Sequence, residues 1–303
     1  MRSIHRPVLL GLWAALGMVF AACQPGGPMQ GPPGCQNLAP GDFECMIGAR
    51  TFLLHVPASY TGQTPVPLVL DFHGFTSTAD AQRRISGWLQ KSDQQGFVVA
   101  YPQGQNNAHR TQGLCCGNPD PNDPQFHRAI VTQIRLAGRI DPGRIFATGL
   151  SNGGAVSHTL ACTASDLFVA VAPVSFQLAG GGKDFATTVA NCNPPRPVAV
   201  IHFHGTADNV APYANGVLDS LGSLASLEAW RQVQSCNPNN VDTRFTSNTV
   251  CERHSGCEGG AFVSLCTVQG GAHVLYPSVS PTGMTIPDIA YPMLLEFADI
   301  DPR

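Results

Sequence analysis

A short glycine-flanked serine motif, Gly149-Leu150-Ser151-Asn152-Gly153, constrains the fold of this chain more than any other feature. An apolar run at residues 145–148 precedes the motif, and a helix-like segment at residues 155–162 follows it. The pattern predicts a strand, a sharp turn and a helix, with Ser151 at the turn. Glycine is needed on both sides of the serine, because a side chain there would collide with neighbouring backbone. A glycine-rich turn that only caps a helix is the simpler alternative.

Strands and helices are expected to alternate along the chain. Most apolar runs are continuous, which is typical of parallel strands covered by helices on both faces. A large core is expected, since 43% of the 303 residues are hydrophobic. We therefore predict an α/β fold with a mainly parallel, doubly wound sheet. The expected strands are 51–56, 68–72, 97–101, 145–148, 168–172, 198–203 and 261–268. The expected helical stripes, whose aromatic and Met residues should pack in the core, are Phe126/Ile130/Ile134/Ala137, Leu224/Leu227/Trp230/Val233 and Met293/Leu294/Phe297.

A serine at such a turn needs a base and an acid, because its hydroxyl is a weak nucleophile until a base removes the proton. In α/β-hydrolases the order along the chain is serine, acid, histidine. Asp208 follows the expected strand 198–203, and His273 follows the strand 261–268. Since sites in such sheets lie beyond the carboxyl ends of strands, we predict a catalytic triad of Ser151, Asp208 and His273. Asp208 would accept the Nδ1 proton of His273, which leaves Nε2 to take the serine proton.

Other acids and histidines are weaker candidates, because they do not directly follow a strand or because they lie within an expected helix or strand. His202 and His204 would point to one face of a strand, as a pair of metal ligands would, but no third ligand follows at a known spacing. We therefore expect no metal. The rival acids are Asp219 and Asp242, and the rival histidines are His158 and His254.

The oxyanion of a tetrahedral intermediate needs two backbone N–H donors. One comes from the residue after the nucleophile, here Asn152, and the other from an earlier loop. That loop is expected at His73-Gly74-Phe75, directly after the strand 68–72, where Gly74 permits a tight turn. We predict the N–H of Phe75 as the second donor. The side chains expected to border a substrate pocket are His73, Tyr101 and Tyr276.

The N-terminus has the pattern of an export signal. Positively charged residues precede an apolar run at residues 8–20, and Ala21-Ala22 provides the small residues that a signal peptidase needs. The apolar run is shorter than the ~20 residues that span a bilayer. Residues 20–23, Phe-Ala-Ala-Cys, resemble a bacterial lipoprotein box, although Phe stands where Leu is usual. Cys23 would then carry the lipid, whereas simple cleavage and release is the alternative.

The domain organisation follows from these segments. Eight of the twelve residues 23–34 are Pro or Gly, which is the composition of a linker. We expect a signal peptide at 1–22, a tether at 23–34 and one domain at 35–303, exported to the extracellular space, the periplasm or the outer surface. The net charge of −3 and the scattered basic residues argue against a nucleic-acid partner. We expect a monomer that contacts a membrane only through the lipid.

The chain has eleven cysteines, and without Cys23 an even number remains, as expected in an oxidising compartment. Cys251 and Cys266 lie at equal distances from a turn near residues 258–260, so they can face each other across a hairpin. Adjacent cysteines do not easily bond to each other. The other expected pairs are Cys236–Cys257 and Cys35–Cys45, and Cys115 and Cys116 would bond to Cys162 and Cys192 in either order.

Several further segments accompany the serine motif. They are Asp71-Phe72-His73-Gly74, Tyr101-Pro102-Gln103-Gly104, Cys115-Cys116-Gly117, Asp141-Pro142, Arg144 to Gly154, His204 to Asp208 and Gly270-Gly271-Ala272-His273. Together, over about residues 52–277, they resemble the secreted α/β-hydrolase esterases that include poly(3-hydroxybutyrate) depolymerases and feruloyl esterases. The resemblance implies carboxylic ester hydrolysis through an acyl-enzyme, without a cofactor, and implies the same triad.

Two departures from this family concern the substrate rather than the reaction. The family often has a Trp before the double cysteine and another after the histidine, where this chain has residues 108–111 and Val274-Leu275-Tyr276. The sequence shows no separate polymer-binding module, which favours soluble oligomers or plant-wall fragments. We therefore expect a feruloyl-esterase-like activity on plant cell-wall esters. The alternatives are a hydroxyalkanoate depolymerase and, in another class, a catalytically silent surface binding lipoprotein.

Overall fold

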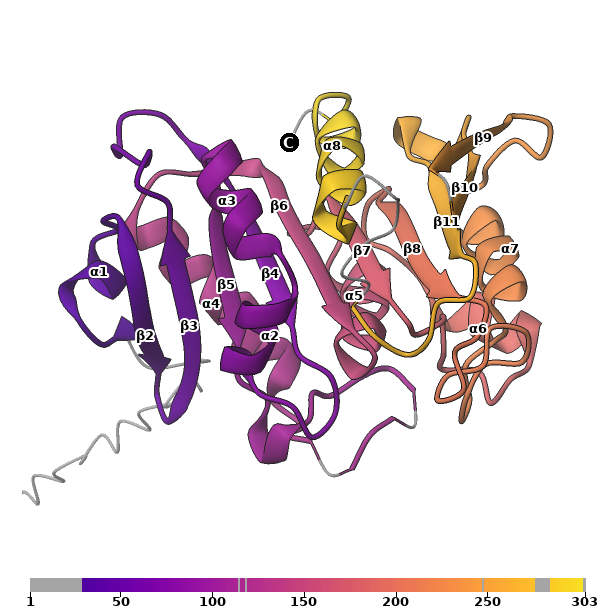
Figure 1. Ribbon diagram of the computed structural model, residues 1–303, viewed down its shortest axis with the longest axis horizontal. Helices are drawn as coiled ribbons and strands as arrows, with labels where there is room; N and C mark the ends of the chain where they lie inside the picture. Colours follow the sequence, from indigo (N-terminus) through magenta and orange to yellow (C-terminus); the bar gives the residue numbers. More distant parts are fainter. Residues whose placement is uncertain (1–28, 114, 118, 247, 276–283, 302–303) are drawn as a thin grey trace, which may run out of the picture.

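One mixed sheet organises the chain. The computed structural model describes residues 29–301 apart from residues 114, 118, 247 and 276–283. The strands lie in the order β1-β2-β3-β5-β4-β6-β7-β8-β11-β10-β9 (Figure 1). The strands are β1 (Met29–Gln30), β2 (Gly41–Ile47), β3 (Arg50–Val56), β4 (Val66–Phe72), β5 (Val98–Pro102), β6 (Ile140–Leu150), β7 (Ala170–Val174), β8 (Ala199–Gly205), β9 (Val241–Thr246), β10 (Thr249–His254) and β11 (Val263–Val268). The helices are α1 (Pro33–Gln36), α2 (Ala79–Ile85), α3 (Trp88–Gln95), α4 (Asp123–Ala137), α5 (Asn152–Thr163), α6 (Phe185–Asn191), α7 (Ser223–Val233) and α8 (Ile286–Ala298).

The centre of the sheet is parallel, as the sequence predicts. Strands β5, β4, β6, β7, β8 and β11 run in parallel, and antiparallel strands flank them on both sides. Every residue of β5, β7 and β8 is buried, which explains why these strands read as continuous apolar runs. Each expected strand coincides with an observed strand to within two residues at both ends, except that β6 begins five residues before the expected start at 145. The edge strands β1 and β9, and β2 next to β1, were not expected.

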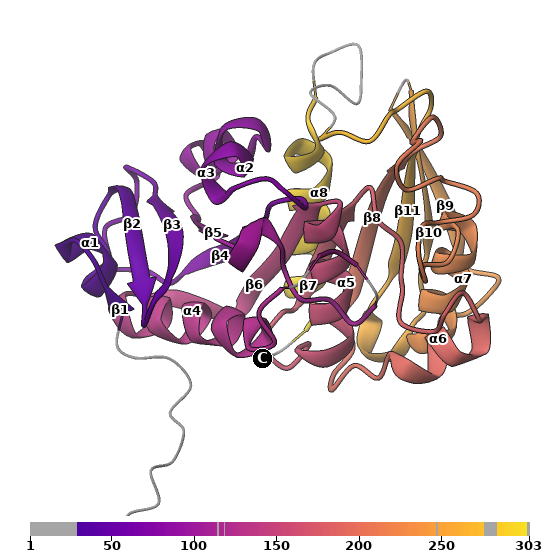
Figure 2. The ribbon, with the colours of Figure 1, turned by 90° about the horizontal axis from the view of Figure 1, so that it is seen from below.

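Helices cover both faces of the sheet (Figure 2). Helices α2, α3 and α8 pack on one face, and α4, α5 and α7 pack on the other. On the first face, Phe97 before β5 stacks on Tyr291 of α8 with ring centroids 4.4 Å apart. On this face of the sheet, the C-terminal helix α8 therefore packs against a residue from the first half of the chain.

Helix α7 buries a different stripe from the one expected. Trp230 and Leu227 are buried together with Ser223 and Ser226, whereas Leu224 is 63% exposed. At 100° per residue, Leu224 lies about 120° around the helix from Trp230, so it cannot share the buried face. The expectation that Leu224 belongs to the core stripe is wrong, because small serines occupy the positions closest to the sheet.

The segment after residue 28 belongs to the folded domain. Met29–Gln30 pairs with β2, and Pro33–Gln36 forms α1, whose Cys35 is bonded to Cys45. The expected tether is therefore wrong from residue 29 onward, because the disulfide and the strand pairing hold this Pro/Gly-rich segment in place. The expected signal peptide and Cys23 lie outside the described residues. Of the helices that the structure describes, none is long and apolar enough to cross a membrane.

Disulfides brace the domain at several places. Three of the pairs are the predicted ones, which confirms Cys35–Cys45, Cys236–Cys257 and Cys251–Cys266. The expectation for Cys115 and Cys116 is wrong, because Cys162 near the end of α5 lies beside Cys192 at the end of α6, with Cα atoms 4.7 Å apart. Cys115 and Cys116 therefore bond to each other. The pairs are Cys35–Cys45, Cys115–Cys116, Cys162–Cys192, Cys236–Cys257 and Cys251–Cys266.

The Cys251–Cys266 disulfide joins directly paired residues of β10 and β11 and closes a loop of 15 residues. We expect the double variant Cys251→Ala/Cys266→Ala to lower the free energy of unfolding by about 3 kcal/mol, because the unfolded chain gains entropy. Urea unfolding without reductant measures the difference. A peptide map of the intact protein that links Cys251 to another cysteine would contradict the pairing.

Candidate active site

Ser151 occupies a strained turn between β6 and α5. Its backbone has φ 57° and ψ −116°, which is unusual for a residue with a side chain. The Ser151 N–H donates to the carbonyl oxygen of Val174 at 2.8 Å, and the Ser151 carbonyl accepts from Ala155 N–H at 2.9 Å. Such a conformation costs about 1–3 kcal/mol and persists only where the surroundings fix it. The strain at a half-exposed serine points to a functional residue.

The glycines around Ser151 permit a close approach of three strands. A Cβ atom at Gly149 or Gly153 would collide with the carbonyl oxygen of Phe72 at the end of β4. A Cβ at Gly154 would lie 2.6 Å from the carbonyl oxygen of Val174 in β7. The motif therefore needs glycine because a side chain would collide with neighbouring backbone, as predicted. As a result, the start of α5 lies directly against the ends of β4 and β7.

Asp208 and His273 meet at the same edge of the sheet. Nδ1 of His273 lies 2.8 Å from Oδ2 of Asp208, although the residues are 65 positions apart. The two loops are also joined through their backbones, because Ala207 N–H donates to the carbonyl oxygen of Gly271 at 2.9 Å. Parallel pairing of β8 with β11 produces this contact. Ser151 stands at the end of β6, two strands away from β8.

The Asp208 carboxylate is surrounded by donors. Its Oδ1 accepts from the N–H groups of Val210 at 2.9 Å and Ala211 at 2.8 Å. Burial pushes the pKa of Asp208 upward, but hydrogen bonds from His204, His273 and Ala211 N–H hold that pKa well below its usual range. Asp208 is therefore ionised at neutral pH and suited to accept the Nδ1 proton of His273.

The loop after β4 lies beside Ser151. A Cβ at Gly74 would be 3.5 Å from Cβ of Ser151, so the backbone of Gly74 and Phe75 borders the serine. The side chain of Asn152 is buried and forms two hydrogen bonds with the backbone of His109. Its Oδ1 accepts from His109 N–H at 2.7 Å, and its Nδ2 donates to the His109 carbonyl at 3.0 Å. These contacts fix the peptide that follows Ser151, where the sequence places one oxyanion donor.

Two of the expected pocket residues are not at a surface. His73 and Tyr101 are completely buried, so the expectation that they border a substrate is wrong. Nδ1–H of His73 donates to the Gly74 carbonyl at 2.8 Å, and Nε2 accepts from Gly104 N–H at 3.0 Å. Burial lowers the pKa of His73, which favours this neutral ring. His73 thus fixes the turn at Gly74. Tyr276 lies outside the described residues.

The rival candidates have other partners. Nδ1 of His158 accepts from Trp230 Nε1–H at 3.0 Å, and burial lowers its pKa to about 3. His254 contacts Glu252 on its own strand at 2.8 Å. Oδ2 of Asp219 accepts from Gly180 N–H at 3.2 Å, and Asp242 lies exposed on β9 beside Arg244. His202 and His204 share a face of β8 and contact each other at 3.1 Å.

One group of side chains in the described chain has the residue types of a metal site, namely His109, Asp123 and His127. The carboxylate of Asp123 is already occupied on both oxygens, by Arg50 Nη2 at 2.6 Å and by Arg110 N–H at 2.6 Å. A cation would have to displace the Arg50 guanidinium. We therefore assign to this group the support of the loop at His109 and Arg110, whose backbone Asn152 and Asp123 bind.

Sequence reasoning missed the contribution of the double cysteine to the site. Cys115 is buried against Ala155 and Phe176, and Nδ2 of Asn152 lies 3.9 Å from its Sγ. A Cβ at Gly117 would lie 2.9 Å from the ring of Phe75. The disulfide segment thus touches both expected oxyanion residues. The Cys-Cys-Gly motif was the available signal, but adjacent cysteines were not expected to bond to each other.

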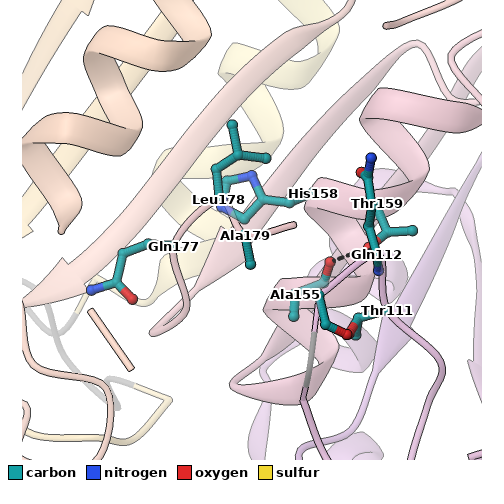
Figure 3. Close-up of a pocket in the computed structure, with 9 residues that line it drawn as sticks. Thr111, Gln112, Ala155, His158, Thr159, Gln177, Leu178 and Ala179 are labelled. Atoms are coloured by element: carbon teal, nitrogen blue, oxygen red, sulfur yellow. Dashed lines mark hydrogen bonds between the residues drawn. The ribbon is translucent and has the colours of Figure 1, made fainter. Parts of the chain in front are cut away.

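A small cavity lies behind α5 (Figure 3). Its walls include Thr111, His158 and Gln177, and Gln112 N–H donates to Thr159 Oγ1 at 2.9 Å beside it. It has room for about one water molecule and is not lined by Ser151, Asp208 or His273. The cavity is therefore too small for an acyl group.

Comparison with known proteins agrees with this architecture. No protein-family model matches the chain. Over 239 residues the chain is 30% identical to feruloyl esterase B of Piromyces equi. The aligned region covers 74% of this chain and 42% of that protein. Over 159 residues it is 32% identical to poly(3-hydroxyalkanoate) depolymerase C of Paucimonas lemoignei, which covers 50% of this chain and 36% of that protein. The acetyl xylan esterase from Aspergillus awamori superposes with a TM-score of 0.58 at 16% identity, covering 90% of this chain and 100% of that one.

These findings define the class of protein. The chain has the α/β-hydrolase fold, with a mainly parallel sheet, flanking helices and disulfides. It is similar in sequence to feruloyl esterases and to a polyester depolymerase, so the resemblance that the motifs indicated is confirmed. The chain spans less than half the length of these two relatives.

We expect Gly153→Ala to lower the free energy of unfolding by about 1–3 kcal/mol, because its Cβ meets the rigid backbone of β4. Urea unfolding measures the loss. Gly182→Ala is the control, since the added Cβ would have nothing within 4 Å, although Gly182, unlike Gly153, has positive φ, at 61°. The control should cost about 1 kcal/mol from backbone strain alone. Equal costs for the two variants would contradict the close approach.

Proposed function

We propose that this chain is a serine carboxylic ester hydrolase with the triad Ser151, Asp208 and His273. The observation that carries the proposal is the 2.8 Å contact between His273 and an ionised Asp208, at the same sheet edge as the strained Ser151. A binding protein would need neither the strain nor the ordered acid–histidine pair. This combination favours catalysis over the silent binding lipoprotein.

The proposed reaction proceeds through an acyl-enzyme. Nε2 of His273 takes the proton of Ser151 as Oγ attacks the ester carbonyl carbon, and Asp208 holds the Nδ1 proton. The N–H groups of Asn152 and Phe75 donate to the oxyanion. The carbon–oxygen bond to the alcohol then breaks, and the alcohol leaves with the proton from His273. Water, deprotonated by His273, attacks the acyl-enzyme in the second half, and the acid leaves as Ser151 regains its proton.

We infer that the substrates are esters of plant cell walls, with feruloyl esters as the first choice. The support is the 30% identity to a protein named feruloyl esterase B, together with Phe75, which is 44% exposed and directly follows Gly74, the residue that lies against Ser151. An exposed aromatic residue on the loop that borders the nucleophile suits an aromatic acyl group. Hydroxyalkanoate oligomers are the second candidate, supported by the similarity to a poly(3-hydroxyalkanoate) depolymerase.

The proposal includes export. The five disulfides fit a chain that works in an oxidising compartment outside the cytoplasm. A lipid at Cys23 would hold the enzyme at a membrane surface, and we propose that the folded domain acts there as a monomer. Mass spectrometry of the mature N-terminus and light scattering of the purified protein test these two points.

We expect Ser151→Ala to lower kcat for ester hydrolysis roughly 10⁵- to 10⁶-fold, because the triad acts as a unit. Asp208→Asn should lower kcat by about 10⁴-fold through the wrong tautomer of His273. Hydrolysis of p-nitrophenyl butyrate measures both, with thermal unfolding as the control for folding. Full activity in Ser151→Ala would overturn the proposal.

The substrate class is tested by comparing kcat/KM for methyl ferulate, a 3-hydroxybutyrate oligomer and p-nitrophenyl butyrate. We expect methyl ferulate to be cleaved fastest. Faster cleavage of the oligomer would favour the depolymerase alternative. A fluorophosphonate probe gives the independent control, because it labels an activated serine whatever the natural substrate is. No hydrolysis and no labelling would leave the binding lipoprotein as the better explanation.

A further inference from the structure

A second buried histidine touches the acid of the proposed triad. His204 lies in β8 and is completely buried, four residues before Asp208. Its Nε2 lies 3.3 Å from Oδ2 of Asp208 and 2.8 Å from the carbonyl oxygen of Ala211. Oδ2 is the same oxygen that accepts from His273. Asp208 therefore lies between two imidazoles, one exposed toward the site and one inside the core.

The position of one proton on His204 follows from its partners. The Ala211 carbonyl can only accept a hydrogen bond, so Nε2 of His204 carries a hydrogen. That hydrogen is donated to the Ala211 carbonyl, and Oδ2 of Asp208 lies 3.3 Å from the same nitrogen. On the other side of the ring, Nδ1 lies 3.1 Å from Nε2 of His202, which fixes the ring plane. His204 is thus a donor to the Ala211 carbonyl, and its Nε2 lies against Oδ2 of Asp208 at 3.3 Å.

His204, Ala211 and Asp208 form a closed set of contacts. The Ala211 N–H donates to Oδ1 of Asp208, the Ala211 carbonyl accepts from His204, and His204 reaches Oδ2. A carboxylate held at both oxygens cannot rotate about its Cβ–Cγ bond. The direction in which Oδ2 meets the Nδ1 proton of His273 is therefore set from inside the core.

We propose that His204 is a positioning residue, which orients the Asp208 carboxylate so that His273 presents Nε2 to Ser151. This inference rests on the proposed function. His204 touches no substrate and takes part in no bond that breaks. Its effect is on geometry, and a misplacement of about 1 Å at reacting groups can lower a rate by about 100-fold.

The surroundings of His204 are polar but contain no second carboxylate among the contacts that the structure gives for this ring. His202 lies on the same strand, and the ring of Tyr213 lies 5.8 Å from His204, with its hydroxyl bound to Thr267 Oγ1 of β11. His158 of α5 lies behind His202, with ring centroids 5.3 Å apart. Asp208 is thus the one carboxylate in contact with His204.

The test compares His204→Leu, which removes the donor, with His204→Gln, whose amide can reach the position of Nε2. We expect His204→Leu to lower kcat about 10- to 100-fold with KM changed by less than about threefold, and His204→Gln to recover most of the loss. The matched control is His55→Leu, which removes a buried imidazole of β3 whose hydrogen-bond partners are Asp42 and Asp93, not residues of the site. That control should lower the melting temperature and leave kcat within about threefold.

A spectroscopic readout separates positioning from simple packing. The Nδ1 proton of His273, in its bond to Asp208, should give a low-field proton resonance in protein labelled with ¹⁵N-histidine. We expect this resonance to shift or broaden in His204→Leu, to return in His204→Gln and to stay unchanged in His55→Leu. An unchanged resonance and an unchanged kcat in folded His204→Leu would overturn the proposal.

Two further outcomes are decisive. If His204→Leu does not fold, His204→Asn replaces it, because its shorter amide reaches the place of Nδ1 but not that of Nε2. Equal activity of His204→Asn and His204→Gln would then overturn the proposal. If the unaltered protein hydrolyses no ester and takes up no fluorophosphonate, the proposed function fails, while the resonance of His273 still decides whether His204 orients Asp208.

Discussion

The close approach of β4, β6 and β7 beneath the start of α5 is the constraint on which the site depends. Gly149, Gly153 and Gly154 leave no room for a Cβ against the carbonyl oxygens of Phe72 and Val174. Because α5 begins this close to the ends of β4 and β7, Ser151 adopts φ 57° at the end of β6. The strain is held by parallel pairing on both sides of the strand, so the sheet maintains the geometry of the serine.

Buried histidines support the site from two directions. On one side, His73 fixes the turn at Gly74, and the backbone of His109 is gripped by Asn152. On the other side, His204 and His202 lie behind Asp208. Burial holds the pKa values of His73, His109 and His202 below the ordinary value. A neutral imidazole can donate and accept at once, and His73 does so with the backbone of Gly74 and Gly104.

Prediction was most successful where local pattern and buried sheet position agree. The segments that form β5, β7 and β8 are buried at every position and mostly apolar, so their existence could be predicted. Strands β2 and β9, near the two edges of the sheet, contain many exposed residues, and their pairing depends on neighbours rather than on their own composition. The core stripe predicted for α7 included Leu224, but the small residues Ser223 and Ser226 are buried instead.

The sequence by itself determined the order of the elements, the glycine turn at Ser151 and the loops that carry Asp208 and His273, because these follow from local periodicity and steric rules. Tertiary structure alone decided that His204 also touches Asp208, that His73 and Tyr101 are buried, and that Cys115 bonds to Cys116. These outcomes depend on distances between segments far apart in the chain. Such distances are set by strand order and helix packing, which no single segment encodes.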